Sequence, residues 1–260
     1  MEAAGVIEKV GENVIDFAVG DRVGYFFSLG AYAERRLINA SDLIRLPHNV
    51  SFDEAASMMA KGLTARMLIK QAYSVKKGDV VLVHAAAGGV GSLVSKWPKV
   101  LGATVIGTVG SAGKKNYALS HGIDHVIVLD SEDLTIEVNH FTENKGVDVV
   151  FDGVGKATFA QSLTVLKNSG TMVLFGSSSG EPFIDQKILN RHNFKLIRPA
   201  VGHYLNDAES VKLASEDMFN AFEKGIFGTI NPTIYNLRDA SKAHQDLESG
   251  VTKGSVIFHI

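Results

Sequence analysis

The pattern that most constrains this 260-residue chain is a strand, a turn of small residues, a helix and a second strand between residues 80 and 109. Apolar runs at 80–84 and 104–109 predict the strands, and residues 90–101 between them have helical spacing. Further strands are predicted at residues 126–129, 147–151 and 170–175. Strands that alternate with helices form parallel sheets from right-handed βαβ units. We therefore expect an α/β fold whose centre is a Rossmann-type doubly wound parallel sheet.

The two ends of the chain have a different character. Short apolar runs broken by glycines predict small strands at residues 6–10, 22–27 and 32–38. Ser51, followed by Asp53 and Glu54, marks the start of a helix. Beyond residue 199, a helix is predicted at 208–224 and two final apolar runs at 230–237 and 255–260. We expect a β-rich first part that the C-terminal part rejoins around the central domain.

Composition excludes several function classes. The chain has no cysteine, which removes disulfides, thiolate nucleophiles and the sulfur ligands of common zinc sites. A formal net charge of -2 offers no broad positive field for nucleic acid or an anionic membrane. We find no basic, apolar leader and no apolar run of about 18 residues, as a spanning helix requires. The expected protein is cytoplasmic and has neither nucleic-acid nor membrane partners.

The turn at residues 86–91, hereafter the glycine turn, has the spacing of a dinucleotide fingerprint with Ala86 in the first glycine position. Gly88 and Gly89 would allow a pyrophosphate to approach the backbone, and Gly91 would allow the helix to pack on the strand. The helix that follows would supply free N–H groups. An ordinary tight turn is the alternative, but a strand before it and a helix after it favour dinucleotide binding.

The residues after the second strand indicate which dinucleotide binds. NAD sites place an acidic residue there for the ribose 2′-OH, and that carboxylate would repel a 2′-phosphate. This chain has no acid between Thr108 and Lys115 but has Ser111, Lys114 and Lys115. These residues predict NADP(H). They also disfavour a methyltransferase, whose cofactor has no phosphate for the lysines.

Six segments in order resemble a known family: GDRVGYF, AKGLTA, HAAAGGVGSL, VVFDGVG, LFGSSSG and IRPAV. Over almost its whole length the chain resembles the NADPH-dependent, zeta-crystallin-like quinone oxidoreductases, the zinc-free branch of the medium-chain dehydrogenases/reductases. The resemblance implies a GroES-like catalytic domain built from residues 1–60 and 201–260, a Rossmann domain at 61–200, and a homodimer.

The resemblance also implies roles for individual residues. Lys61 and Thr64 would line the nicotinamide and substrate side, and Ser111 and Lys114 would meet the 2′-phosphate. The pyrophosphate would contact Gly88, Gly89 and Val90, the nicotinamide ribose and carboxamide would lie near Phe175 and Ser177, and Ala87, Thr108 and Gly110 complete the predicted cofactor site.

Three departures from the family are visible. The family carries about half a domain ahead of the segment that begins at Glu2, including Asn, Asp and Tyr residues of the substrate side, so we expect cofactor binding with slow turnover. Leu129 stands where relatives often have a cofactor-contacting tyrosine. Pro98 lies inside a predicted helix, where the missing N–H and the ring predict a kink after Trp97.

Without a metal to polarise a carbonyl, the acceptor must be electron-poor, as quinones and activated enones are. The cofactor would perform the reduction while the protein orients it and excludes water. No metal ligands and no general acid stand out, and His84, His203 and His244 are interpreted as structural or surface residues. Two alternatives to a quinone reductase remain open: an NADPH-dependent enoyl or alkenal reductase, and a non-catalytic NADPH-binding, crystallin-like protein.

Overall fold

The computed structural model describes residues 2–260, which form two compact units. Unit 1 contains the residues up to Leu63 together with Leu205–Ile260, and unit 2 is Thr64–Tyr204. The boundary falls inside the first long helix, α1 (Phe52–Met67), which a π-helical turn at Leu68–Ala72 extends. In the part of the chain that the structure describes, we find no helix long and apolar enough to cross a membrane.

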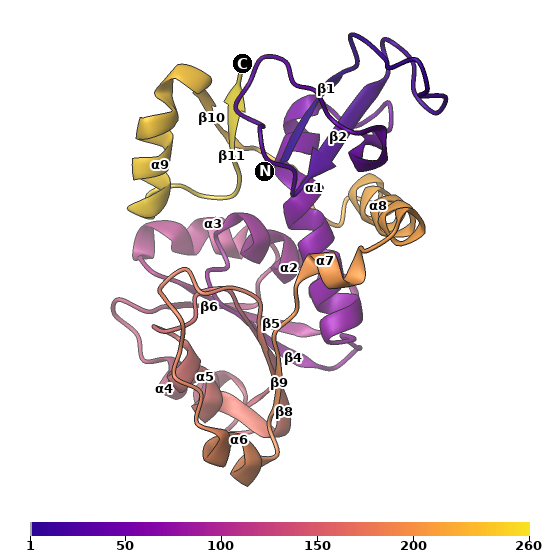
Figure 1. The fold of residues 1–260 in the computed structure, drawn as a ribbon. Helices are drawn as coiled ribbons and strands as arrows, with labels where there is room; N and C mark the ends of the chain where they lie inside the picture. The colour runs from indigo at the N-terminus through magenta and orange to yellow at the C-terminus, as the bar shows by residue number, and fades with distance from the viewer. Residues whose placement is uncertain (1) are drawn as a thin grey trace. The chain divides into compact units, whose positions relative to one another are not determined.

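Unit 2 is built on a six-stranded parallel sheet (Figure 1). Its strands are β4 (Val80–Val83), β5 (Thr104–Val109), β6 (His125–Val128), β7 (Val147–Asp152), β8 (Leu166–Leu174) and β9 (Lys195–Ile197). Their order is β6-β5-β4-β7-β8-β9, the doubly wound order of dinucleotide-binding domains, which confirms the predicted fold class. In the central strand, Leu82 lies opposite Ile106 of β5 and Val150 of β7.

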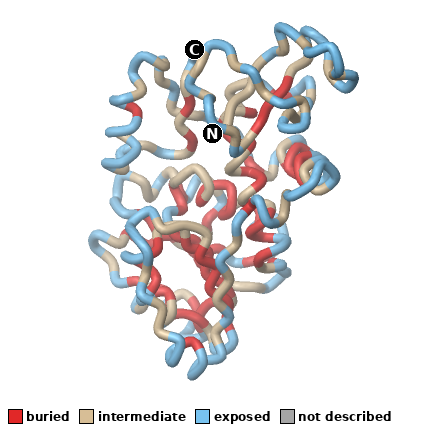
Figure 2. Tube along the Cα trace, viewed as in Figure 1, coloured by how far each residue is buried: buried red, intermediate tan, exposed pale blue. Residues whose placement is uncertain are grey.

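Helices connect these strands, as parallel pairing requires. They are α2 (Gly89–Val100), α3 (Lys115–Leu119), α4 (Leu134–Phe141), α5 (Phe159–Val165) and α6 (Gln186–His192), and a short helix, α7 (Val201–Tyr204), follows the last strand. Val81, Leu82 and Val83 of β4 are all fully buried, so both faces of the sheet are covered. Figure 2 shows this buried core running along the strands.

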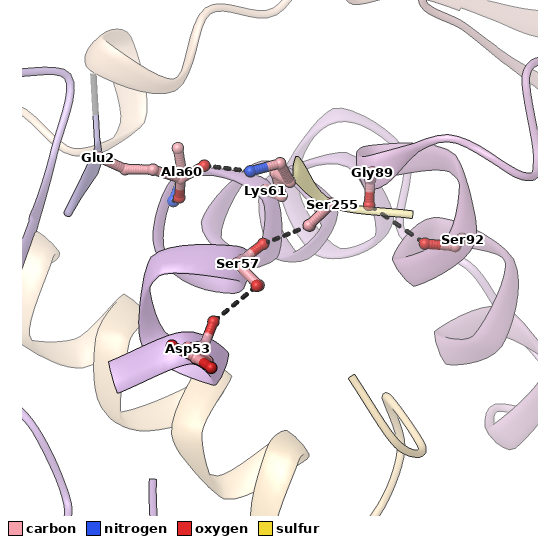
Figure 3. Close-up of polar contacts among 8 residues, drawn as sticks. All are labelled: Glu2, Asp53, Ser57, Ala60, Lys61, Gly89, Ser92 and Ser255. Carbon is pink, nitrogen blue, oxygen red and sulfur yellow. Dashed lines mark hydrogen bonds and ion pairs between the residues drawn. The ribbon is translucent and has the colours of Figure 1, made fainter. Parts of the chain in front are cut away.

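Unit 1 takes its elements from both chain ends. An antiparallel sheet contains β1 (Glu2–Val6), β2 (Arg22–Phe26) and β3 (Ile44–Arg45), and a parallel pair contains β10 (Thr233–Asn236) and β11 (Val256–His259). The helices are the start of α1, α8 (Ala208–Glu223) and α9 (Ala240–Glu248). The Ser255 hydroxyl donates to the Ser57 carbonyl at 2.8 Å, which ties the C-terminal segment to α1 (Figure 3).

The predicted helix start at Ser51 is confirmed in detail. The Glu54 amide donates to the Ser51 hydroxyl at 3.2 Å, and the Glu54 carboxylate accepts from the Ser51 amide at 2.9 Å. Each residue thus satisfies a backbone or side-chain group of the other, which is the reciprocal pattern of a capping box.

The predicted strand at residues 32–38 is wrong. This segment pairs with no strand, and side-chain contacts hold it in place. The Tyr32 ring packs edge-on against Phe258, with ring centroids 4.9 Å apart. Arg36 lies over the Tyr25 ring and donates to the Ser28 carbonyl and hydroxyl. The short apolar runs that predicted a strand at this segment do not reveal these side-chain contacts, which involve residues distant in the sequence.

Pro98 does not end α2, which continues to Val100. The proline lies in the last turn of the helix, where its missing N–H removes the usual bond to the carbonyl four residues earlier but no further turn follows to be disrupted. The Leu101 amide bonds to the Trp97 carbonyl at 3.2 Å, and the Ala103 amide bonds to the Pro98 carbonyl at 3.1 Å. Backbone groups on both sides of the proline are therefore satisfied.

Candidate functional site

The glycine turn connects β4 to α2 and leaves the start of the helix uncapped. Ala85 has a φ of 49°, and its carbonyl accepts from the Gly88 amide at 2.8 Å, which closes the turn. Gly88 is the extended N-cap of α2, and no side chain caps the helix. The first-turn amides and the helix dipole can therefore receive an anion here.

Glycine is required at the end of the turn for steric reasons. A Cβ on Gly91 would lie 2.2 Å from the Ala85 carbonyl oxygen, and one on Gly88 would lie 3.1 Å from the same oxygen. The first distance is impossible for real atoms, so the backbone of α2 packs directly on the turn. Gly91 therefore has the packing role that the sequence predicted for it.

Gly107 of β5 packs against the glycine turn, and sequence reasoning did not find this contact. A Cβ on Gly107 would lie 2.8 Å from the Ala86 Cβ, so the bare backbone of β5 makes room for the alanine in the first glycine position. The available signal was a glycine inside an otherwise apolar strand, which marks a close approach of another backbone.

The two lysines that follow β5, Lys114 and Lys115, have different surroundings. Lys115 pairs with Glu132 at 3.1 Å, and the Glu132 carboxylate also accepts from the Val128 amide. These two hydrogen bonds, the backbone one foremost, lower the pKa of Glu132. Lys114 forms no ion pair with any residue in the described range 2–260. Of the two lysines, Lys114 is the one left for a phosphate, and Ser111 and Gly110 beside it are exposed.

Thr108 and Ala87, by contrast, lie inside unit 2. Both are almost completely buried, and the Thr108 hydroxyl bonds to His84 at 2.9 Å. The Thr108 carbonyl accepts from the Ala86 amide at 2.9 Å. The structure therefore joins Thr108 to the glycine turn through the interior and not through an exposed side chain.

Phe175 and Ser177 follow β8 and lie beside the loop after β7. A Cβ on Gly153 would lie 2.8 Å from the Phe175 ring, so the ring rests on the bare backbone of that glycine. The Ser177 hydroxyl donates to Glu181 at 2.8 Å, and Glu181 pairs with Arg198 at 2.6 Å. These contacts, the serine first, lower the pKa of Glu181.

All of these loops leave the same edge of the sheet. The glycine turn follows β4, Ser111 follows β5, residues 153–158 (hereafter the Asp152 loop) follow β7, and Phe175 follows β8. Because the strands are parallel, their carboxyl ends meet at one edge, the edge at which doubly wound domains bind ligands. The structure thus brings together the predicted phosphate and nicotinamide residues of unit 2.

Lys61 belongs to unit 1 and has a partner there. Its ammonium group pairs with the Glu2 carboxylate, which also accepts from the Ala60 amide at 2.7 Å (Figure 3). Thr64 lies three residues further along α1 and therefore on the same helix face. Sequence reasoning did not find Glu2, because it lies 59 positions before Lys61 in the sequence and no local pattern links the two.

The histidines singled out in the sequence are scattered. His84 is buried in unit 2, His203 is exposed on α7, and His244 of α9 bonds to the Tyr32 hydroxyl at 2.9 Å. Within residues 2–260, no three His, Asp or Glu side chains are grouped so as to hold a metal ion.

Comparison with known proteins gives consistent matches. A family model described as zinc-binding dehydrogenase matches residues 89–216. Quinone oxidoreductase 1 of Escherichia coli is 40% identical over 99% of this chain and 80% of its own length. A 2-haloacrylate reductase from a Burkholderia species is 38% identical over 99% of this chain and 79% of its own length. The crystal structure of E. coli quinone oxidoreductase complexed with NADPH has a TM-score of 0.95, at 39% identity, covering 100% of this chain and 81% of the other.

The doubly wound sheet and the uncapped glycine turn define unit 2 as a dinucleotide-binding Rossmann domain. At this identity and coverage, the chain belongs to the quinone oxidoreductase family of the medium-chain dehydrogenases/reductases. It spans about four-fifths of the length of these relatives, as the 80% and 81% coverages show.

Proposed function

We propose that this protein uses NADPH to reduce quinones. The observation that carries the proposal is a pair of features at the carboxyl edge of the sheet in unit 2. The start of α2 at the glycine turn is uncapped, and Lys114 has no ion-pair partner in residues 2–260. Relatives named quinone oxidoreductase support the acceptor, and the NADPH complex of one of them supports the cofactor.

Each part of the site has a separate task in this proposal. The first-turn amides of α2 hold the pyrophosphate, and Lys114 with Ser111 holds the 2′-phosphate. Phe175 and Ser177 orient the nicotinamide end, and Lys61 and Thr64 contribute to the substrate side. Bound NADPH supplies the hydride, so the residues of the chain contribute orientation and the exclusion of water.

Cofactor preference tests the proposal. We expect NADPH to bind at least about tenfold more tightly than NADH, a difference of about 1.4 kcal/mol. Lys114→Ala should remove most of this difference by weakening NADPH alone. Lys115→Ala is the matched control, because Lys115 is already paired with Glu132 and should leave the preference nearly unchanged. Equal affinities of the unmodified protein in a fluorescence titration would contradict the NADPH assignment.

Reduction of an activated carbon–carbon double bond is the second candidate function. A relative named 2-haloacrylate reductase matches this chain almost as well as the quinone oxidoreductases do, at 38% identity against 40%. Steady-state oxidation of NADPH with phenanthrenequinone, 2-chloroacrylate and an enoyl thioester separates the two functions. The acceptor with the highest kcat/KM identifies the reaction, and NADPH binding with no acceptor-dependent oxidation would support a non-catalytic protein.

We further propose that the protein is a cytoplasmic homodimer that works without a metal ion. In this proposal, unit 1 is the GroES-like catalytic domain and unit 2 is the cofactor domain; the units divide after Leu63 and Tyr204, a few residues beyond the predicted 60 and 200. Light scattering measures the oligomeric state, and metal analysis of the active protein tests the metal-free mechanism. A monomer, or activity lost on chelation and restored by zinc, would contradict these assignments.

A further inference from the structure

A buried polar network lies beneath the glycine turn, centred on His84. Its ring nitrogens lie 2.9 Å from the Thr108 hydroxyl and 2.8 Å from the Ser162 hydroxyl. All three side chains are at most 1% exposed, so no water competes for these bonds. In such a buried network each donated proton needs an acceptor, because a buried polar group without a hydrogen-bond partner costs free energy.

The partners assign the position of every proton in the network. The Ser162 hydroxyl donates its one proton to the Thr158 carbonyl at 2.8 Å, which can only accept. The Ser162 oxygen must therefore accept from His84, so Nε2 of the ring carries a proton. Burial lowers the pKa of His84, against a smaller opposing effect of the Asp152 charge, and the ring is neutral. Nδ1 is consequently an acceptor, and the Thr108 hydroxyl donates to it.

The same network reaches three loops at the ligand-binding edge of the sheet. Through Ser162 it joins Thr158, whose hydroxyl donates to Asp152 at 2.7 Å, and Asp152 also accepts from the amides of Val154 and Gly155. Through Thr108 it reaches the end of β5, because Thr108 lies three residues before Ser111. His84 itself precedes the glycine turn by one residue, Ala85.

We propose that His84, protonated on Nε2, is a positioning residue that holds the end of β5 through Thr108 and so positions Ser111 and Lys114 to bind the 2′-phosphate. This role rests on the proposed NADPH preference. The two ring nitrogens of His84 have separate tasks: Nδ1 holds the segment that selects NADPH over NADH, while Nε2 holds α5 and the Asp152 loop. Loss of the first bond should change cofactor preference, whereas loss of the second should not.

Two substitutions separate the tasks of the two nitrogens. In His84→Asn, the amide oxygen takes the place of Nδ1 and can still accept from Thr108. In His84→Gln, the amide nitrogen takes the place of Nε2 and can still donate to Ser162, but Thr108 loses its acceptor. We expect His84→Gln to lower the ratio of NADPH to NADH affinity about fivefold, and His84→Asn to keep it within about twofold.

Thr108→Val is the second route to the same bond, should His84→Gln fail to fold. It keeps the shape of the side chain and removes the hydroxyl, and we expect the same fall in the ratio. Ser162→Ala is the matched control on the other nitrogen and should leave the ratio unchanged. A purely structural role would weaken NADPH and NADH equally in all four variants, because it acts on the whole domain.

The outcomes distinguish this inference from the proposed function. Equal affinities of the unmodified protein for NADPH and NADH would overturn the proposed cofactor and this role with it. A clear preference for NADPH that survives in both His84→Gln and Thr108→Val would overturn the role of His84 alone. Nitrogen-15 NMR of the His84 ring checks the network without any cofactor, since a proton found on Nδ1 contradicts the assigned tautomer.

Discussion

At the scale of single residues, the Ala85 carbonyl limits which side chains fit at Gly88 and Gly91. Its oxygen accepts a hydrogen bond from the Gly88 amide and lies so close to Gly91 that no Cβ fits there. A backbone oxygen cannot turn away as a flexible side chain can, so a methyl group at residue 91 must displace either the turn or α2. Both carry the amides proposed to bind phosphate, which couples this packing contact directly to cofactor affinity.

Gly91→Ala should therefore damage binding as well as stability. We expect a loss of about 1–3 kcal/mol in the free energy of unfolding, the usual cost of overpacking. NADPH affinity should fall by at least about tenfold, a loss of about 1.4 kcal/mol in binding. Urea unfolding and fluorescence titration measure the two effects. Gly202→Ala on α7 is the control, because a Cβ there meets nothing within 4 Å. Wild-type NADPH affinity in Gly91→Ala would show that the phosphate binds elsewhere.

At the scale of elements, β5 packs against the glycine turn at the contact between Gly107 and Ala86. Gly107→Ala should destabilise the protein by about 1–3 kcal/mol, since its new methyl group meets the fixed Cβ of Ala86 at 2.8 Å. The Ile123 side chain lies equally close, but its tip can move. The reciprocal pair Ala86→Gly with Gly107→Ala should recover much of that loss in thermal or urea unfolding. A double variant no more stable than Gly107→Ala would contradict this account.

Five of the six strands of unit 2 could be predicted, because each contains a run of apolar residues, whereas β9 (Lys195–Ile197) is too short to show one and was not predicted. Segments held by distant contacts could not be predicted either. The segment at residues 32–38 has the short apolar runs of a small strand, yet Tyr32 packs on Phe258, more than 200 residues away. The site shows the same division. Gly91 and Lys114 follow from local patterns, whereas the Glu2–Lys61 pair and the His84 network depend on tertiary structure.

At the scale of the whole molecule, the proposed roles divide between the two units. The glycine turn and Lys114, which would hold the charged phosphates, belong to unit 2, and the Glu2–Lys61 pair belongs to unit 1. Charge-assisted contacts to phosphates provide much of the affinity for a dinucleotide. Changes in unit 1 should therefore act mainly on turnover, and changes at the glycine turn mainly on binding.

Lys61→Met tests this division in the intact chain. If Lys61 contributes to the substrate side, its loss should lower kcat/KM for phenanthrenequinone about tenfold, a cost of about 1.4 kcal/mol in the transition state. The Kd for NADPH should change by less than about threefold, since the proposed phosphate contacts remain. Lys242→Met is the control, because Lys242 is also an ion-paired lysine of unit 1 but its side chain is 67% exposed, against 22% for Lys61.

Lys61→Met also leaves the largely buried Glu2 carboxylate without its cation, so both assays belong at a temperature where circular dichroism shows the variant folded. A variant that turns over like Lys242→Met would remove Lys61 from the substrate side, and one that loses NADPH binding and turnover together would show that the two units do not divide the work.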